Sequence, residues 1–156
     1  LQDAYQKRDR VGMIAFRRQQ AEVLLPITRS VDLAQKRLAE MPTGGKTPLA
    51  DGLATALLTI AKLNKKDSEL EPILVLVTDG RANAVEENGG DPVEAAIKMA
   101  EKIRKAKITS VVIDTENDFI KLGVAKKVAQ AMGASYYNLR QLSKEHILRI
   151  VRNLGE

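Results

Sequence analysis

The sequence predicts an α/β protein with a doubly wound, mostly parallel sheet and helices on both of its faces. Helical and strand patterns alternate along the chain with short connections, as expected of parallel strands joined by crossover helices. Residues 73–77 (ILVLV) form a continuous run typical of a central parallel strand covered on both faces. Residues 11–16 and 21–26 are separated by only four residues, so they predict an antiparallel pair whose second strand, near Val23, lies at an edge of the sheet.

Local signals mark the first three helices. Ser30 can cap a helix whose apolar residues recur at spacings of three and four up to Met41. Thr47 is a good N-cap for the next helix, with Pro48 at the first helical position, and the pattern runs to about residue 64. Residues 91–94 (DPVE) form a capping box that opens a helix to about Lys105.

The remaining elements complete the alternation. Residues 108–113 (ITSVVI) predict another buried strand, which ends at Asp114. A helix over about residues 122–132 ends at Gly133, which suits a left-handed cap. A short strand over residues 134–139 follows, and Ser143 can cap a last helix.

Composition indicates one domain over residues 1–156 and excludes several function classes. Aromatic residues are only 3% of the chain, which disfavours a base-stacking platform for nucleic acid. The net charge is +5, but the basic residues stand beside acidic ones, a pattern more typical of solvated helix faces than of a docking surface. There is no cysteine, no run of about 20 apolar residues and no visible signal peptide. We therefore expect a cytoplasmic protein without a membrane span. The given chain starts with Leu1 and not with Met.

Two short motifs carry the candidate chemistry, "TGGKTPLADG" at residues 43–52 and "VTDGRAN" at residues 77–83. In open α/β sheets ligands bind at the carboxyl ends of the central strands. Thr47 at a helix start and Asp79 just past a strand can both reach that edge. Taken singly, each motif is explained by structure alone, as a helix cap and as a turn. A phosphate-binding loop fits poorly, because it needs glycine where this chain has Glu40.

Together the motifs point to a hard divalent cation, which prefers carboxylate, hydroxyl and water oxygens. "TGGKTPLADGL" followed by "LVLVTDGRAN" resembles the von Willebrand factor A domain, in the version found in the D subunit of magnesium and cobalt chelatases. "DRVGMIAF" and "LLPITRSVDLAQKRL" match the same pattern, so the resemblance covers essentially the whole chain. It implies a metal-ion-dependent adhesion site in which Thr47 and Asp79 are ligands of Mg²⁺.

One part of that family pattern is missing. The family's first, central strand carries an Asp-x-Ser-x-Ser loop, which this sequence lacks. The resemblance therefore implies a truncated sheet, with the missing strand between residues 11–16 and 73–77. It also implies an incomplete metal site that binds Mg²⁺ weakly or not at all.

The function implied by the resemblance is that of a protein-interaction module and not of a catalyst. Its partners would be an AAA+ ATPase subunit and the large chelatase subunit, in metal insertion into a tetrapyrrole, and its oligomeric state stays open. Lys46 and Arg81 flank the site and could dock a partner's carboxylate, and Asn83 could brace the loop; solvated charge and a turn residue explain them as well. His146 is the lone histidine and is expected at the surface.

Two other functions stay open from the sequence. The first is a von Willebrand factor A module that serves another AAA+ ATPase outside tetrapyrrole synthesis. The second is a small nucleotide-binding α/β enzyme that uses Lys46 and Asp79 on a phosphate. The second is disfavoured because no glycine-rich turn follows a strand here.

Overall fold

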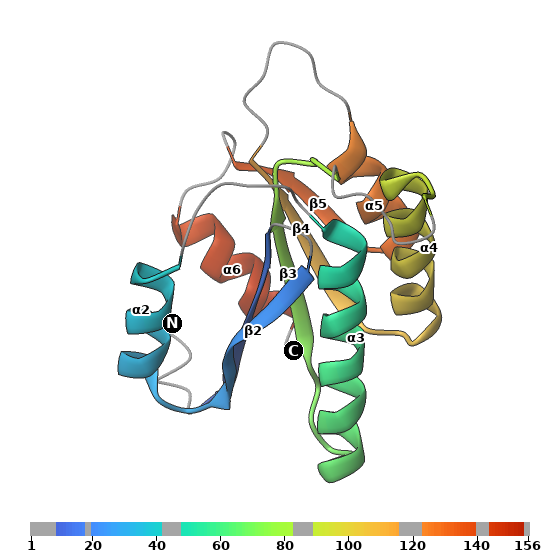
Figure 1. The fold of residues 1–156 in the computed structure, drawn as a ribbon. Coiled ribbons are helices and arrows are strands. Elements are labelled where there is room, and N and C mark those ends of the chain that lie inside the picture. The colour runs from blue at the N-terminus through green and yellow to red at the C-terminus, as the bar shows by residue number, and fades with distance from the viewer. Residues whose placement is uncertain are drawn as a thin grey trace.

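The computed structural model describes residues 9–17, 20–41, 48–82, 89–115, 123–139 and 144–154 (Figure 1). The fold is α/β, as predicted. Among the described residues an initial hairpin is followed by two helices in succession, after which strands and helices alternate.

The hairpin consists of strands β1 (Val11–Arg17) and β2 (Gln20–Thr28), which pair antiparallel as predicted. Their register shifts between Val11 and Met13 and between Met13 and Ile14. Pro26 lies in β2, a strand that pairs only with β1 within the described chain. Proline cannot donate to a further strand, so it protects this outer edge against unwanted pairing.

The second sheet contains three parallel strands in the order β3 (Ile73–Thr78), β4 (Thr109–Asp114) and β5 (Ser135–Asn138). Their pairing is regular: Val75 aligns with Val111, and Val111 aligns with Ser135. All three strands were predicted, and their parallel arrangement is confirmed. Their carboxyl ends therefore meet at one edge of the sheet.

The hairpin and the three-stranded sheet are two separate sheets, with no ladder joining them within the described residues. The consequence shows on β3, whose Val75 and Val77 side chains are 40% and 54% exposed. Their neighbours on β4, Val111 and Ile113, are buried. Within the described part of the chain, β3 therefore has one unpaired edge and an incompletely covered face, and the sequence predicts a missing strand beside it.

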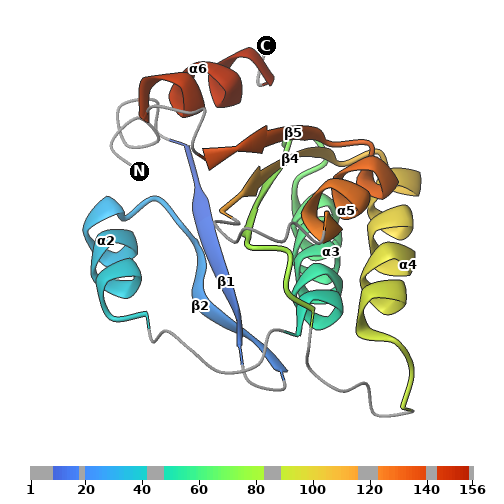
Figure 2. The ribbon, with the colours of Figure 1, turned by 90° about the horizontal axis from the view of Figure 1, so that it is seen from above.

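Helices lie on both sides of the strands (Figure 2). One side carries α3 (Leu49–Lys66), α4 (Pro92–Lys105) and α5 (Val124–Met132). On the opposite side, away from these helices, lie α6 (Lys144–Leu154) and α2 (Val31–Ala39), and α2 packs against the hairpin. This is the doubly wound arrangement that the alternating pattern predicts.

Most of the predicted helix ends are confirmed. Ser30 caps α2 by accepting a hydrogen bond from the Leu33 backbone N–H, and Asp91 caps α4 in the same way through Val93. Gly133 ends α5 in the left-handed conformation. Ser143, the predicted cap of α6, lies outside the described residues.

The predicted start of α3 is wrong by one residue. Pro48 is the N-cap and not the first helical residue: its ψ of 72° is outside the helical range, and Pro48 itself makes no side-chain capping hydrogen bond. Pro48 and Leu49 are both buried, so core packing decides where the helix begins. The predicted cap, Thr47, lies outside the described residues.

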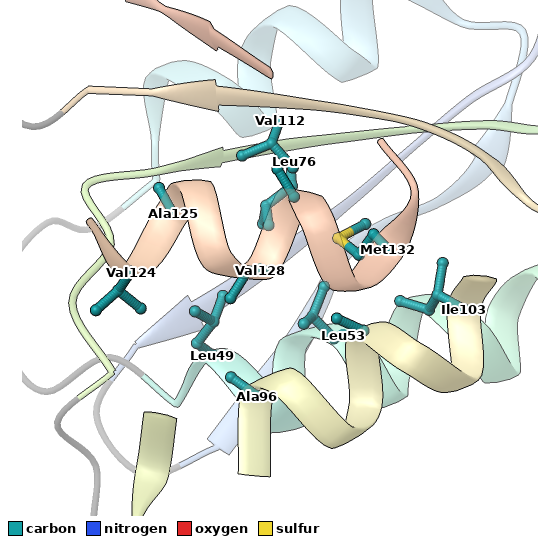
Figure 3. Close-up of a cluster of buried hydrophobic side chains, with 12 residues drawn as sticks. Leu49, Leu53, Leu76, Ala96, Ile103, Val112, Val124, Ala125, Val128 and Met132 are labelled. Atoms are coloured by element: carbon teal, nitrogen blue, oxygen red, sulfur yellow. The ribbon is translucent and has the colours of Figure 1, made fainter. Parts of the chain in front are cut away.

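The core lies between the three-stranded sheet and helices α3 to α5 (Figure 3). Its members are aliphatic, as a chain with 3% aromatic residues requires. The largest fully buried side chains include Leu49 and Leu53 of α3, Ile103 of α4, and Val128 and Met132 of α5. This packing holds α3 and the end of β3 in fixed relation, and the candidate site lies where they reach the carboxyl edge.

Candidate functional site

Asp79 stands directly after β3, at the carboxyl edge of the three-stranded sheet. Thr78, the last residue of β3, is buried and pairs with Asp114 of β4. The Asp79 side chain is 40% exposed, so its carboxylate faces solvent from a rigid strand end. This is the position predicted for it, and it is where ligands of open α/β sheets bind.

Two hydrogen bonds hold the turn that carries Asp79. The Thr78 hydroxyl accepts from the Gly80 backbone N–H at 3.1 Å, and the Thr78 carbonyl accepts from the Thr115 N–H at 2.9 Å. Gly80 has a φ of +79°, a left-handed conformation that side chains disfavour. It also lies against α5: a Cβ added to Gly80 would stand 3.1 Å from the backbone nitrogen of Ala125.

We expect Gly80→Ala to destabilise the protein by at least about 1–2 kcal/mol, the cost of one left-handed non-glycine residue. The close approach to the α5 backbone adds to that cost, because backbone cannot swing aside. Gly89→Ala is the matched control, since Gly89 also has a positive φ, of +73°, but nothing lies within 4 Å of its added Cβ. Urea unfolding of both variants measures the difference, and equal losses would show that the contact with α5 is unimportant.

Asp79 is paired with Arg81 through both of its carboxylate oxygens. Oδ1 accepts the Arg81 backbone N–H at 2.9 Å, and Oδ2 lies 3.2 Å from the guanidinium Nε. The sequence placed Arg81 beside the site, where docking of a partner's carboxylate and solvated charge both stayed open. The structure brings its guanidinium onto Asp79, a contact that the sequence pattern did not reveal.

The other predicted site residues, Lys46, Thr47 and Asn83, lie outside the described residues. The start of α3 nevertheless lies at the same edge as Asp79, because α3 ends beside the beginning of β3 and so runs opposite to it (Figure 1). The closeness of Thr47 to Asp79 stays a prediction. A structure with their side chains at opposite ends of the sheet would contradict the metal-site interpretation.

Asp51, in the first turn of α3, ties the hairpin to this region. Its carboxylate accepts a hydrogen bond from the Ala21 backbone N–H at the start of β2. Asp51 of the "TPLADG" motif therefore holds α3 against β2. The sequence did not suggest this role, because Ala21 and Asp51 are thirty positions apart. Sequence reasoning had no signal for this contact.

Asp114 is a second carboxylate at the carboxyl edge, and it is buried, with only 3% of the residue exposed. The Tyr136 hydroxyl, from β5, donates a hydrogen bond to its Oδ2. A buried carboxylate needs such partners, because its desolvation would otherwise be costly. The sequence indicated that Asp114 ends its strand as Asp79 does, but not that Asp114 is buried with a tyrosine partner.

These donors do not make a complete metal site. No group of three or more histidine, cysteine, aspartate or glutamate side chains suited to a metal occurs in the part of the chain that the structure describes. Of the two carboxylates that the structure describes at this edge, Asp114 is buried and Asp79 is exposed, and a carboxylate suits Mg²⁺ as one ligand among several.

The fold and this edge define a class: an open α/β domain that presents polar groups from strand-end loops. The sequence profile of the von Willebrand factor type A domain matches residues 1–82. The chain belongs to the von Willebrand factor type A domain family.

Curated relatives agree with the predicted resemblance. An uncharacterized protein of Methanocaldococcus jannaschii is 43% identical, over 99% of this chain and 88% of its own length. The magnesium-chelatase 67 kDa subunit of Heliobacterium mobile is 37% identical, over 98% of this chain, and that of Chlorobaculum parvum is 38% identical, over 95%. The chain spans only 24% and 25% of those two subunits.

Solved structures show the same fold. The conserved hypothetical protein BatB of Bacteroides thetaiotaomicron superposes with a TM-score of 0.69 over 95% of this chain and 80% of its own, at 17% identity. The SpRpn10 VWA domain superposes with a TM-score of 0.63 over 83% of this chain and 64% of its own, at 15% identity. Among the described helices, none has the length and apolar character needed to cross a membrane.

Proposed function

We propose that this chain is the protein-interaction module of a magnesium- or cobalt-chelatase D-type subunit. In this role it binds an AAA+ ATPase subunit and the large chelatase subunit, and it takes part in metal insertion into a tetrapyrrole in the cytoplasm. The observation that carries the proposal is the similarity to two magnesium-chelatase subunits over at least 95% of this chain. The module acts by binding and does not itself catalyse a reaction.

The carboxyl edge of the sheet is the proposed contact surface. Asp79 is exposed there on a turn that Gly80 and Thr78 hold in place. The resemblance adds Lys46, Thr47 and Asn83 to this surface and Mg²⁺ as its cofactor, bound weakly by this chain because it offers few oxygen donors. A partner's carboxylate would complete the coordination of the cation.

The test measures binding of the purified chain to the AAA+ ATPase subunit and to the large subunit of a chelatase, with Mg²⁺ present. We expect Asp79→Asn to weaken binding at least tenfold, which corresponds to about 1.4 kcal/mol. Lys98→Ala is the control, because Lys98 forms an exposed pair with Glu94 on α4, at 3.5 Å. Undiminished binding of Asp79→Asn would contradict the proposed surface.

A second candidate is a module that serves another AAA+ ATPase. The relative in Methanocaldococcus jannaschii favours it, because 88% of that protein's length matches this chain. A domain like this chain therefore makes up nearly all of that protein, whereas it makes up only about a quarter of each magnesium-chelatase subunit. Binding to an unrelated AAA+ ATPase, and to no chelatase subunit, would select this candidate.

The nucleotide-enzyme alternative has its own test. We expect no ATP hydrolysis above background from the purified chain. Turnover that Lys46→Ala abolishes would favour the enzyme over the binding module.

A further inference from the structure

Asp114 and Tyr136 form a buried polar pair that the proposed contact surface does not use. Asp114 is the last residue of β4, and it is buried. Tyr136 lies on β5, two positions before Asn138, which aligns with Asp114. Residues two apart on a strand share a face of the sheet, so the side chains of Tyr136 and Asp114 are diagonal neighbours. The Tyr136 ring packs against the core on that face.

The hydrogen bond between them fastens the end of β4 to β5. The Tyr136 hydroxyl donates to Oδ2 of Asp114. Because Asp114 is buried, its carboxylate needs donors from the protein, and loss of one donor is costly. β5 has only four residues, so its backbone pairing with β4 is short. The side-chain bond adds a link at the carboxyl end, where a strand would otherwise fray.

The end of β4 in turn supports the turn that carries Asp79. Thr115, the residue after Asp114, donates its backbone N–H to the Thr78 carbonyl at 2.9 Å. Thr78 directly precedes Asp79, and its hydroxyl accepts the Gly80 N–H at 3.1 Å. A β4 end that loosens at Asp114 therefore weakens the hydrogen bond that joins it to Thr78, one residue before Asp79.

We propose that Tyr136 and Asp114 are positioning residues for the turn that presents Asp79. They act through the end of β4, and Asp79 makes the contact with the partner. The turn after β3 therefore depends on a hydroxyl group from β5, although β4 separates these two strands in the sheet. The consequence for binding rests on the contact surface proposed above, whereas the positioning of the turn does not.

The Gly80 amide resonance measures this positioning in the folded chain. Tyr136→Phe removes only the hydroxyl, and it should shift the Gly80 amide resonance and make this amide exchange with solvent about three- to tenfold faster, as expected for loss of one hydrogen bond. A loss of overall stability does not move the resonances of a chain that stays folded. Tyr137→Phe is the matched control, because Tyr137 lies on the opposite face of β5 and should leave the Gly80 amide unchanged.

Binding to the AAA+ ATPase subunit provides the second measurement. Tyr136→Phe should weaken binding about three- to tenfold, whereas Tyr137→Phe should bind as the wild type does. In the Asp79→Asn background, Tyr136→Phe should have no further effect, because it acts through the position of the Asp79 carboxylate. Equal losses in both backgrounds would overturn the proposal, since Tyr136 would then act independently of Asp79.

The contact surface and the positioning role fail in different ways. Undiminished binding of Asp79→Asn contradicts the contact surface, and the Gly80 amide then still decides whether Tyr136 positions the turn. A Gly80 amide that keeps its wild-type resonance and exchange rate in Tyr136→Phe overturns the positioning role.

Discussion

A version of this chain that supplies a strand between β1 and β3 is expected to unfold at a clearly higher urea concentration than residues 1–156 alone. β1 and β3 belong to separate sheets in the described structure, and Val75 and Val77 are exposed on β3. Each backbone group left unsatisfied in an apolar setting costs about 1–3 kcal/mol. Because a typical domain is stable by only about 5–15 kcal/mol, filling this gap has the largest effect that we expect.

We propose that the strand comes from residues that are continuous with this chain and precede Leu1. Two alternatives are a strand inserted by another chain and direct pairing of β1 with β3. The described residues show no ladder between β1 and β3, which disfavours direct pairing. The chelatase subunits that this chain resembles contain much additional sequence, since the chain spans about a quarter of each.

The measurement compares residues 1–156 with the same chain extended by the in-frame residues encoded before Leu1. Val77→Thr provides an internal probe. It should change the stability of the short chain by no more than about 0.5 kcal/mol, as for other exposed positions, and should cost more in the extended chain. A stable monomer whose intact mass matches only residues 1–156 would contradict both the extension and the inserted strand.

The extension should also alter metal binding if it carries the Asp-x-Ser-x-Ser loop. Its carboxylate and hydroxyls would add oxygen donors to the exposed carboxylate of Asp79. We expect calorimetry to detect Mg²⁺ binding by the extended chain and weak or no binding by residues 1–156. Equal binding by the two chains would count against the incomplete-site interpretation.

Gly52→Ala is expected to destabilise the protein by up to about 2 kcal/mol, although alanine is the better helix former. Gly52 is buried in α3 where the helix crosses β1. An added Cβ would lie 2.7–2.8 Å from Phe16, against its Cβ, Cγ and Cδ1 atoms. Because these atoms are close to the Phe16 backbone, the strand itself must move. This overpacking, at about 1–3 kcal/mol, exceeds the helix-propensity gain of about 1 kcal/mol.

Two comparisons make this prediction specific. In the Phe16→Ala background the ring atoms are gone, so the added cost of Gly52→Ala should fall by about 0.5 kcal/mol or more, the size of coupling expected between contacting residues. Gly12→Ala is the matched control on the same hairpin. Its added Cβ would meet the terminal Cδ1 atom of Ile27, which is 37% exposed and can change rotamer. Urea unfolding of the four variants and the wild type would contradict the prediction if Gly12→Ala cost as much as Gly52→Ala.

The sequence by itself determined the elements of this protein and the signals at their ends. The run at residues 73–77 predicted β3, and Ser30, Asp91 and Gly133 predicted three helix ends that the structure confirms. The motif at Asp79 indicated the family, and it placed Asp79 directly after a strand, where the structure has it. Such signals can be read from a sequence because periodicity and capping depend on residues within a few positions of each other.

Only the tertiary structure decided which distant groups meet. Packing of Pro48 and Leu49 into the core moved the start of α3 away from the position that the local cap signal predicts. Asp114 accepts a hydrogen bond from Tyr136, on a neighbouring strand, and the guanidinium of Arg81 lies on Asp79. These contacts depend on how helices and strands are brought together in space, and no pattern of neighbouring residues encodes that geometry.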